Sequence, residues 1–164
     1  MALSDQLKLP NSLVSQVDVA RIMRELNSLN DFFINSRARP AGSPVQPPRL
    51  TRPLDQLAQN NQCNLLEEPQ RKQLYDQLNN ILGRAPLLHM SFAAEPSTKA
   101  LETVIVWLRA NIHPQALLQV GLQPTIAAGC ILRTPNRIFD MSMRSHLKEQ
   151  EPYLVELIAG AARE

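Results

Sequence analysis

Five prolines that stand close together between Pro40 and Pro53 constrain the fold of this chain more than any other feature. Proline fixes the φ angle and has no backbone N–H to donate, so the stretch cannot form a helix or a central strand. We therefore predict an extended linker over residues 36–53. A solvated basic linker is the simpler interpretation of its charges, and contact with an acidic partner or an anionic lipid face is the alternative. Those charges are Arg37, Arg39, Arg49 and Arg52.

The segment before the linker, residues 11–35, is predicted to form one helix. Pro10 with Asn11 or Ser12 marks its start, because asparagine and serine side chains accept hydrogen bonds from the free N–H groups of a first turn. Its apolar residues are three and four positions apart, which places them on one stripe. The stripe either packs against the chain's own next helix or binds a helix of another chain. It consists of Val19, Ile22, Leu26, Leu29 and Phe33.

Two shorter helices are predicted after the linker, over residues 53–61 and 68–83. Pro69 lies at the start of the second helix, where a missing N–H is tolerated. Gly83 follows the last apolar residue of that helix, in the position where glycine commonly ends one. Residues 1–84 are therefore predicted to be a helical arm that the proline-rich linker interrupts.

Residues 85–164 are predicted to form a small α/β domain. Helices are expected over residues 97–112 and from about residue 141 onward, with a kink or restart at Pro152. Between and before them, short apolar runs and a tight turn at residues 134–136 indicate strands. The predicted fold class is α+β: a helical arm, then a βαβββα-type unit with a mixed sheet and two packed helices. The predicted strands cover residues 87–93, 116–120, 126–132 and 137–139, and the predicted inner face of the first helix holds Ala100, Val104, Trp107 and Leu108.

The composition indicates a mostly aliphatic core, because 44% of the residues are hydrophobic and only 4% are aromatic. The net charge of +2 gives no basic footprint of the kind that nucleic-acid binders show, so no nucleic-acid partner is expected. The first ten residues do not resemble a secretion signal, and no apolar run approaches the roughly 18 residues that span a bilayer.

Few residues in the sequence suggest chemistry. Cys63 and Cys130 are far apart and outside CxxC spacing, which argues against a zinc site or a disulfide scaffold. Cys130 could be paired with His113 or His146 as nucleophile and base, but it lies in an apolar run, where cysteine usually acts as a small hydrophobic residue. The glycine motifs that bind phosphates are absent. We therefore predict no enzyme activity, no cofactor and no metal site.

The segment from Ala127 to Leu147, AAGCILRTPNRIFDMSMRSHL, resembles the C-terminal signature of the delta subunits of F-type ATP synthases, called the oligomycin-sensitivity-conferring protein in mitochondria. Upstream, the segment 91–97 is similar to the strand exit before that family's next helix, and residues 65–82 look like the helix that joins its two domains. Each signature residue also has a physical role: a glycine allows close backbone approach in a strand, and Asp140 and Ser142 are expected to cap the final helix. The matching residues are Gly129, Arg133, Ile138, Phe139, Asp140, Ser142 and Leu147.

The resemblance implies a structural subunit of the peripheral stalk, the stator that holds the catalytic head against torque during proton-driven ATP synthesis. The implied partners are the b subunits and the α/β catalytic head, and the implied location is cytoplasmic, peripheral on the inner face of the cell membrane. One departure is large: the family's N-terminal six-helix bundle, which binds the α subunits, does not fit before the joining helix. The alternatives are a stator of a V-type or secretion-type ATPase, or an unrelated module that binds a partner helix.

Overall fold

The computed structural model describes residues 7–37, 48–126, 128–134 and 136–161. These residues form five α-helices and one four-stranded mixed sheet, so the fold is α+β, as predicted. The chain divides into an N-terminal unit, Met1–Leu87 with Thr98–Leu118, and a C-terminal unit, Leu88–Ser97 with Gln119–Glu164. The sequence placed residues 98–118 with the C-terminal part, whereas the structure groups them with the N-terminal helices.

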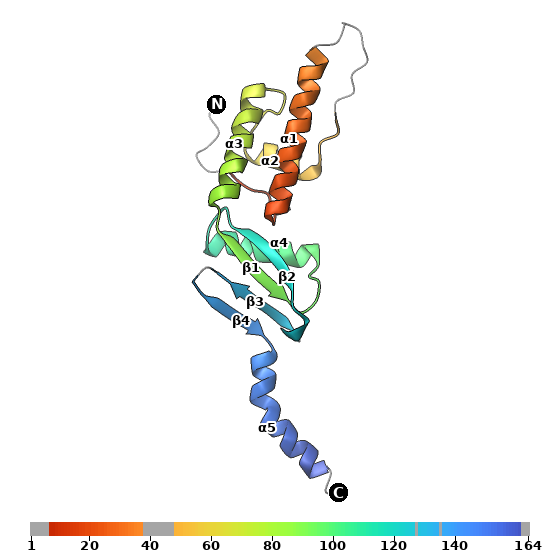
Figure 1. Ribbon diagram of the computed structural model, residues 1–164, viewed down its shortest axis with the longest axis vertical. Coiled ribbons are helices and arrows are strands. Elements are labelled where there is room, and N and C mark those ends of the chain that lie inside the picture. Colours follow the sequence, from red (N-terminus) through yellow and green to blue (C-terminus); the bar gives the residue numbers. More distant parts are fainter. Residues whose placement is uncertain (1–6, 38–47, 127, 135, 162–164) are drawn as a thin grey trace. The chain divides into compact units, whose positions relative to one another are not determined.

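The described part of the N-terminal unit contains four helices. They are α1 (Gln16–Arg37), α2 (Arg52–Asn60), α3 (Glu68–Arg84) and α4 (Thr98–Asn111). Three of them, α1, α2 and α3, contribute side chains to one aliphatic core. Helix α1 packs against both α2 and α3 (Figure 1). The bounds of α2 and α3 agree with the prediction to within one residue. The core between these helices and the segment before α1 is formed by side chains that include Leu7, Leu13, Val19, Ile22, Leu26, Leu54, Leu57, Leu74 and Leu78.

Helix α1 starts later than predicted, because a different residue caps it. The N–H of Asp18 donates to Ser15 Oγ at 3.2 Å, and the N–H of Ser15 donates to the Asp18 carboxylate at 3.0 Å. This reciprocal pair is a capping box, which satisfies free N–H groups on both sides of the helix start. Residues 11–14 are therefore not helical, and the segment before Ser15 instead buries Leu13 and Val14.

The predicted linker is described only in part. Residues 38–47, which include Arg39, lie outside the described residues, while residues 48–50 have no helix or strand. At the end of the linker, the N–H and the hydroxyl of Thr51 both donate to the Glu25 carboxylate at 2.6 Å. This pair of bonds links the residue before α2 to the side of α1. Pro53 lies in the first turn of α2, where its missing N–H is tolerated.

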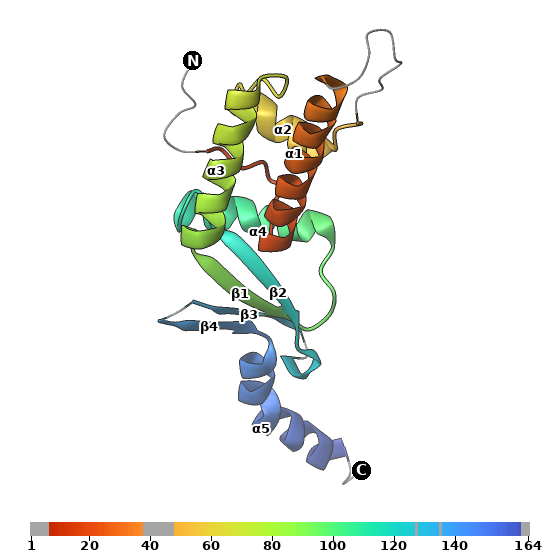
Figure 2. The ribbon, with the colours of Figure 1, turned by 45° about the horizontal axis from the view of Figure 1, so that its top comes forward.

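The sheet has the strand order β2-β1-β3-β4 (Figure 2). Strand β3 is antiparallel to both β1 and β4, and a short 3₁₀ helix at Pro124–Ile126 leads from β2 to β3. The registers place Met90 beside Leu132 and Gly129 beside Ser142. The predicted succession of strand, helix and three strands is confirmed. The strands are β1 (Leu87–Phe92), β2 (Leu117–Leu122), β3 (Gly129–Arg133) and β4 (Ile138–Ser142).

The C-terminal unit buries few apolar side chains. Among its described residues, the buried apolar ones are Leu88, Met90, Ile126 and Leu132. After β4 the chain forms α5 (Arg144–Ala161), which continues through Pro152 as one helix rather than restarting there. None of the described helices is both long and apolar enough to cross a membrane.

Candidate functional site

The hairpin of β3 and β4 holds three of the predicted signature residues in one place. Gly129 has a φ angle of +92°, and a Cβ atom built on it would lie 2.4 Å from the carbonyl oxygen of Met141. Glycine is therefore required here both by the backbone angle and by the closeness of β4. The predicted role of Gly129, close backbone approach inside a strand, is confirmed.

Asp140 and Ser142 lie in β4 rather than in the first turn of the following helix. The N–H of Ser142 donates to Asp140 Oδ1 at 2.9 Å. Hydrogen bonds from the side chain and backbone of Ser142 lower the pKa of Asp140, and the charge of Arg144 adds a smaller effect. The predicted capping of the final helix by Asp140 is thus wrong: its carboxylate accepts from the Ser142 N–H within β4. In the first turn of α5, the N–H of Leu147 donates to the carbonyl oxygen of Met143.

The remaining signature residues lie at opposite ends of this hairpin. Arg133 ends β3 next to a tight turn in which the Thr134 N–H donates to the Arg137 carbonyl at 2.8 Å. Leu147 lies in the first turn of α5 and is half exposed. The structure therefore brings Gly129, Asp140 and Ser142 together, and places Arg133 and Leu147 apart from them.

Exposed apolar side chains lie along β4, the turn that follows it and α5, and we call this set of residues the C-terminal apolar surface. The prediction of two packed helices is wrong for α5: Leu154 is 48% exposed and Ile158 is 67% exposed. Large contiguous patches of exposed apolar side chains mark interaction sites in many proteins. The surface comprises Ile138, Phe139, Met141, Met143, Leu147, Tyr153, Leu154, Val155 and Ile158.

The predicted partner-binding stripe of α1 is part of the chain's own core. Four of its side chains are buried, and Phe33 packs against the same cluster. Of the two interpretations of this stripe, packing within the chain is therefore the one that the structure shows. The stripe is not available to a partner helix in this fold, because α2 and α3 already cover it. The four buried residues are Val19, Ile22, Leu26 and Leu29.

Arg109 of α4 is a structural residue that the sequence reasoning missed. Its guanidinium donates to the carbonyl oxygens of Pro10 at 2.9 Å and Ala116 at 3.3 Å, and also to that of Leu13. Burial lowers the pKa of Arg109 to about 10. A signal was present in the sequence, since Arg109 follows the buried Ile105 by one helical turn and so lies on the buried side of α4.

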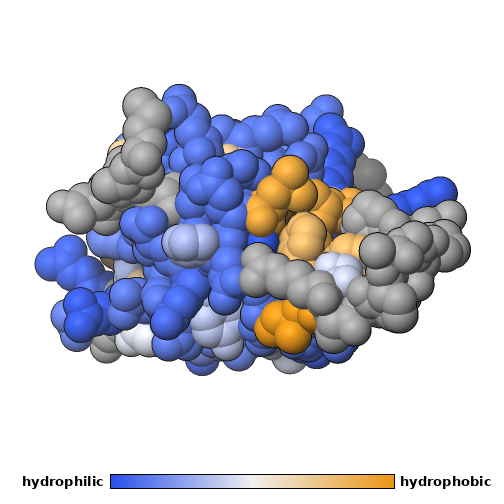
Figure 3. Space-filling model, turned by 90° about the horizontal axis from the view of Figure 1, so that it is seen from above, coloured by the Kyte–Doolittle hydropathy of each residue, from blue (hydrophilic) through white to orange (hydrophobic). Residues whose placement is uncertain are grey.

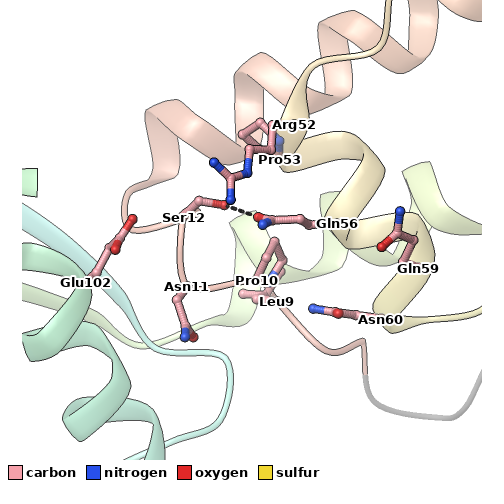
Figure 4. Close-up of a pocket in the computed structure, with 10 residues that line it drawn as sticks. All are labelled: Leu9, Pro10, Asn11, Ser12, Arg52, Pro53, Gln56, Gln59, Asn60 and Glu102. Atoms are coloured by element: carbon pink, nitrogen blue, oxygen red, sulfur yellow. Dashed lines mark hydrogen bonds between the residues drawn. The ribbon is translucent and has the colours of Figure 1, made fainter. Parts of the chain in front are cut away.

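A polar hollow of about 700 Å³ opens in the N-terminal unit (Figure 4). Across it, Ser12 Oγ donates to Gln56 Oε1 at 3.1 Å. Four of its ten lining residues carry side-chain amides, one is a cation and one a carboxylate, and none is a cysteine or histidine that could serve as nucleophile or base. The lining residues are Leu9, Pro10, Asn11, Ser12, Arg52, Pro53, Gln56, Gln59, Asn60 and Glu102.

The described residues hold no group of three or more histidine, cysteine, aspartate or glutamate side chains placed to bind a metal ion. Both cysteines are free thiols, and burial raises the pKa of each. A thiol with a raised pKa is a poor nucleophile near neutral pH.

No family model matches the chain, and no curated protein matches it.

Proposed function

We propose that this chain is a structural subunit of the peripheral stalk of a rotary F-type ATP synthase. In that role it links the catalytic head to the b-subunit stalk and resists torque during proton-driven ATP synthesis. It would lie at the inner face of the cell membrane, held there by other subunits. The observation that carries the proposal is the C-terminal apolar surface, which begins within the segment that resembles the delta-subunit signature and continues along α5.

Two features of the C-terminal unit support this proposal. The glycine of the motif is required by its φ angle and by the neighbouring β4, which is the physical role expected of it from the sequence. The surface beyond the hairpin is apolar and exposed on α5, and an apolar helix face is what packs against the helices of a stalk.

A second candidate is a stator or adaptor of a V-type or secretion-type ATPase. The observation that favours it lies in the N-terminal unit, where the described residues before Leu87 form only three helices. A six-helix bundle of the delta type is therefore not present among them, and the grip on the head would differ from that of the family.

The test is affinity capture of the tagged full chain from detergent-solubilised membranes of its host, with the retained proteins identified by mass spectrometry. The proposal predicts recovery of the F-type α, β and b subunits. Recovery of a V-type or secretion-type ATPase would favour the second candidate, and recovery of no ATPase would contradict both.

A pair of variants shows whether the capture uses the C-terminal apolar surface. Leu154→Glu with Ile158→Glu should abolish capture without unfolding the chain, because both side chains are exposed. Lys148→Gln with Glu156→Gln alters the same helix but leaves its apolar residues unchanged, so this control should be captured like the wild type. Equal capture of both variants would exclude α5 from the docking surface.

A further inference from the structure

Arg71 of α3 is a buried cation, only 3% exposed, whose partners among the described residues are all uncharged. Its Nη1 donates to the carbonyl oxygen of Leu65 at 2.9 Å, and its Nη2 donates to Asn30 Oδ1 at 3.0 Å. The guanidinium carbon lies 4.6 Å from the centre of the Phe33 ring. The Nε atom is buried and has no hydrogen-bond partner.

Among the described residues, no carboxylate is hydrogen-bonded to the guanidinium of Arg71. A guanidinium stays protonated at physiological pH and carries five N–H donors in a planar fork. Burying such a charge is costly unless an anion pairs with it, and a buried donor without an acceptor adds to that cost. Carbonyl and amide oxygens and an aromatic face offset only part of it, because none of them carries a full negative charge.

A hollow of about 280 Å³ reaches this arginine from the surface. Both partners of one of its bonds, Arg71 and Asn30, line the hollow. Three further lining side chains can donate hydrogen bonds to a guest: Asn27, Lys72 and Tyr75. The size suits a small ion or one side chain, since pockets for larger ligands usually occupy about 300–1,000 Å³.

The charges at the rim do not forbid an anion. Two carboxylates, Glu68 and Asp76, also line the hollow, and both are exposed to solvent. Exposed charges are screened by water and salt, whereas the buried charge of Arg71 is screened much less. The inner end of the hollow is therefore cationic while its rim is mixed.

We propose that this hollow is an oxyanion site in which a carboxylate or a phosphate replaces Asn30 Oδ1 as the partner of Arg71. The amide of Asn30 is then free to turn its NH₂ group toward the same anion, because an asparagine side chain carries both a donor and an acceptor. The exchange replaces a neutral acceptor with a charged one, and charge-assisted hydrogen bonds are about twice as strong as neutral ones. The site is independent of the proposed stalk function.

Substituting Asn30→Asp tests the site without removing Arg71, whose loss could simply unfold the unit. The variant places a carboxylate beside Nη2, so it should melt at a higher temperature than the wild type and should bind an added anion at least about tenfold more weakly, because like charges repel at short range. Asn27→Asp is the matched control: it adds the same charge to the same hollow from an exposed position of α1, and it should have a much smaller effect on either quantity.

The probes are inorganic phosphate and acetate, each titrated into the full chain at constant ionic strength with chloride as balance, and followed by amide chemical shifts around Arg71 and by melting temperature. Saturable shifts with either probe that Asn30→Asp abolishes would establish the site, and the stronger of the two probes identifies phosphate or carboxylate as its ligand. The absence of saturable shifts with both probes, or equal binding by Asn30→Asp, would overturn the proposal and leave Arg71 a purely structural residue. A melting temperature of Asn30→Asp no higher than that of the wild type would contradict its premise of a missing counterion.

Discussion

The N-terminal unit buries most of its large apolar side chains, whereas the C-terminal unit leaves many of them exposed. The N-terminal unit places its aliphatic side chains in one core and adds buried polar contacts such as those of Arg109 and Asn61. The C-terminal unit leaves most of its large apolar side chains on β4 and α5 exposed. Large exposed apolar patches mark interaction sites in many proteins, so the difference between the units is the basis of the proposed docking role of the C-terminal unit. The face of the molecule in Figure 3 shows mostly hydrophilic residues with a small apolar area.

The largest expected effect is the difference in stability loss when a leucine is replaced by alanine in one unit or in the other. Leu74→Ala in the core should lower the free energy of unfolding by about 2–5 kcal/mol, because it removes a fully buried side chain and leaves a cavity. Leu154→Ala on α5 should change it by no more than about 0.5 kcal/mol, as expected for an exposed position. Urea denaturation of both variants checks the comparison, and equal losses would mean that α5 is packed in solution.

Arg109 tests how far the N-terminal unit depends on its buried polar contacts. Arg109→Met should lower the free energy of unfolding by roughly 2–3 kcal/mol, because buried carbonyl oxygens of the segment before α1 lose their donor. Arg24→Met, at an exposed position of α1, is the control and should be nearly neutral. Hydrogen exchange adds a local readout: the N–H of Leu13, which donates to Pro10, should lose protection in Arg109→Met, and unchanged protection would contradict the role given to Arg109.

Alanine substitutions at two glycines test the packing of the strands in the C-terminal unit. Gly129→Ala should destabilise the β3–β4 hairpin by on the order of 1–3 kcal/mol, the range typical of a strained backbone conformation, and more if the strands must separate. Gly121→Ala should be tolerated, because its Cβ would meet only Ser91 Oγ at an ordinary 3.6 Å. Amide exchange in β4 distinguishes the two, and a neutral Gly129→Ala would show that β4 does not pack on β3 as described.

The smallest effect concerns the pH dependence of the end of β4. The pKa of Asp140 is lowered from its ordinary 3.8, mainly by Ser142, so the folded state favours the ionised carboxylate. The resulting stabilisation is present above pH 3.8 and is lost as the pH falls through the lowered pKa of the folded state. The stability difference between wild type and Asp140→Asn should therefore shrink on acidification, and a difference that grows would contradict this assignment.

Much of the fold follows from local sequence signals, and the departures have physical causes. The helix bounds of α2 and α3 were predicted from their prolines and apolar spacing, but the start of α1 depended on a Ser15–Asp18 capping box that competes with Asn11. On α4 the predicted inner face included Trp107, which is 58% exposed. Periodicity places residues on a stripe but does not say which edge of that stripe faces the core.

The candidate sites were harder to predict than the fold, because they depend on contacts between distant residues. The stripe of α1 looked like a partner surface only as long as the helices that cover it were not placed in space. Arg71 and Arg109 each continue an apolar stripe, at the turn before Leu74 and after Ile105, and an arginine at such a position was the available signal for a buried cation. Exposure of the apolar residues of α5 is a property of the tertiary structure that no local pattern reveals.

Site-specific photocrosslinking in the host cell tests the central claim, that a partner protein completes the C-terminal unit. A photoreactive phenylalanine analogue replaces Leu154 or Ile158 on α5, and Gln150 on the same helix serves as the reference position. The account predicts strong crosslinks from the two apolar positions to another protein, with a b-type stalk subunit as the expected product. No crosslink from either position, or crosslinks only to a second copy of this chain, would contradict it.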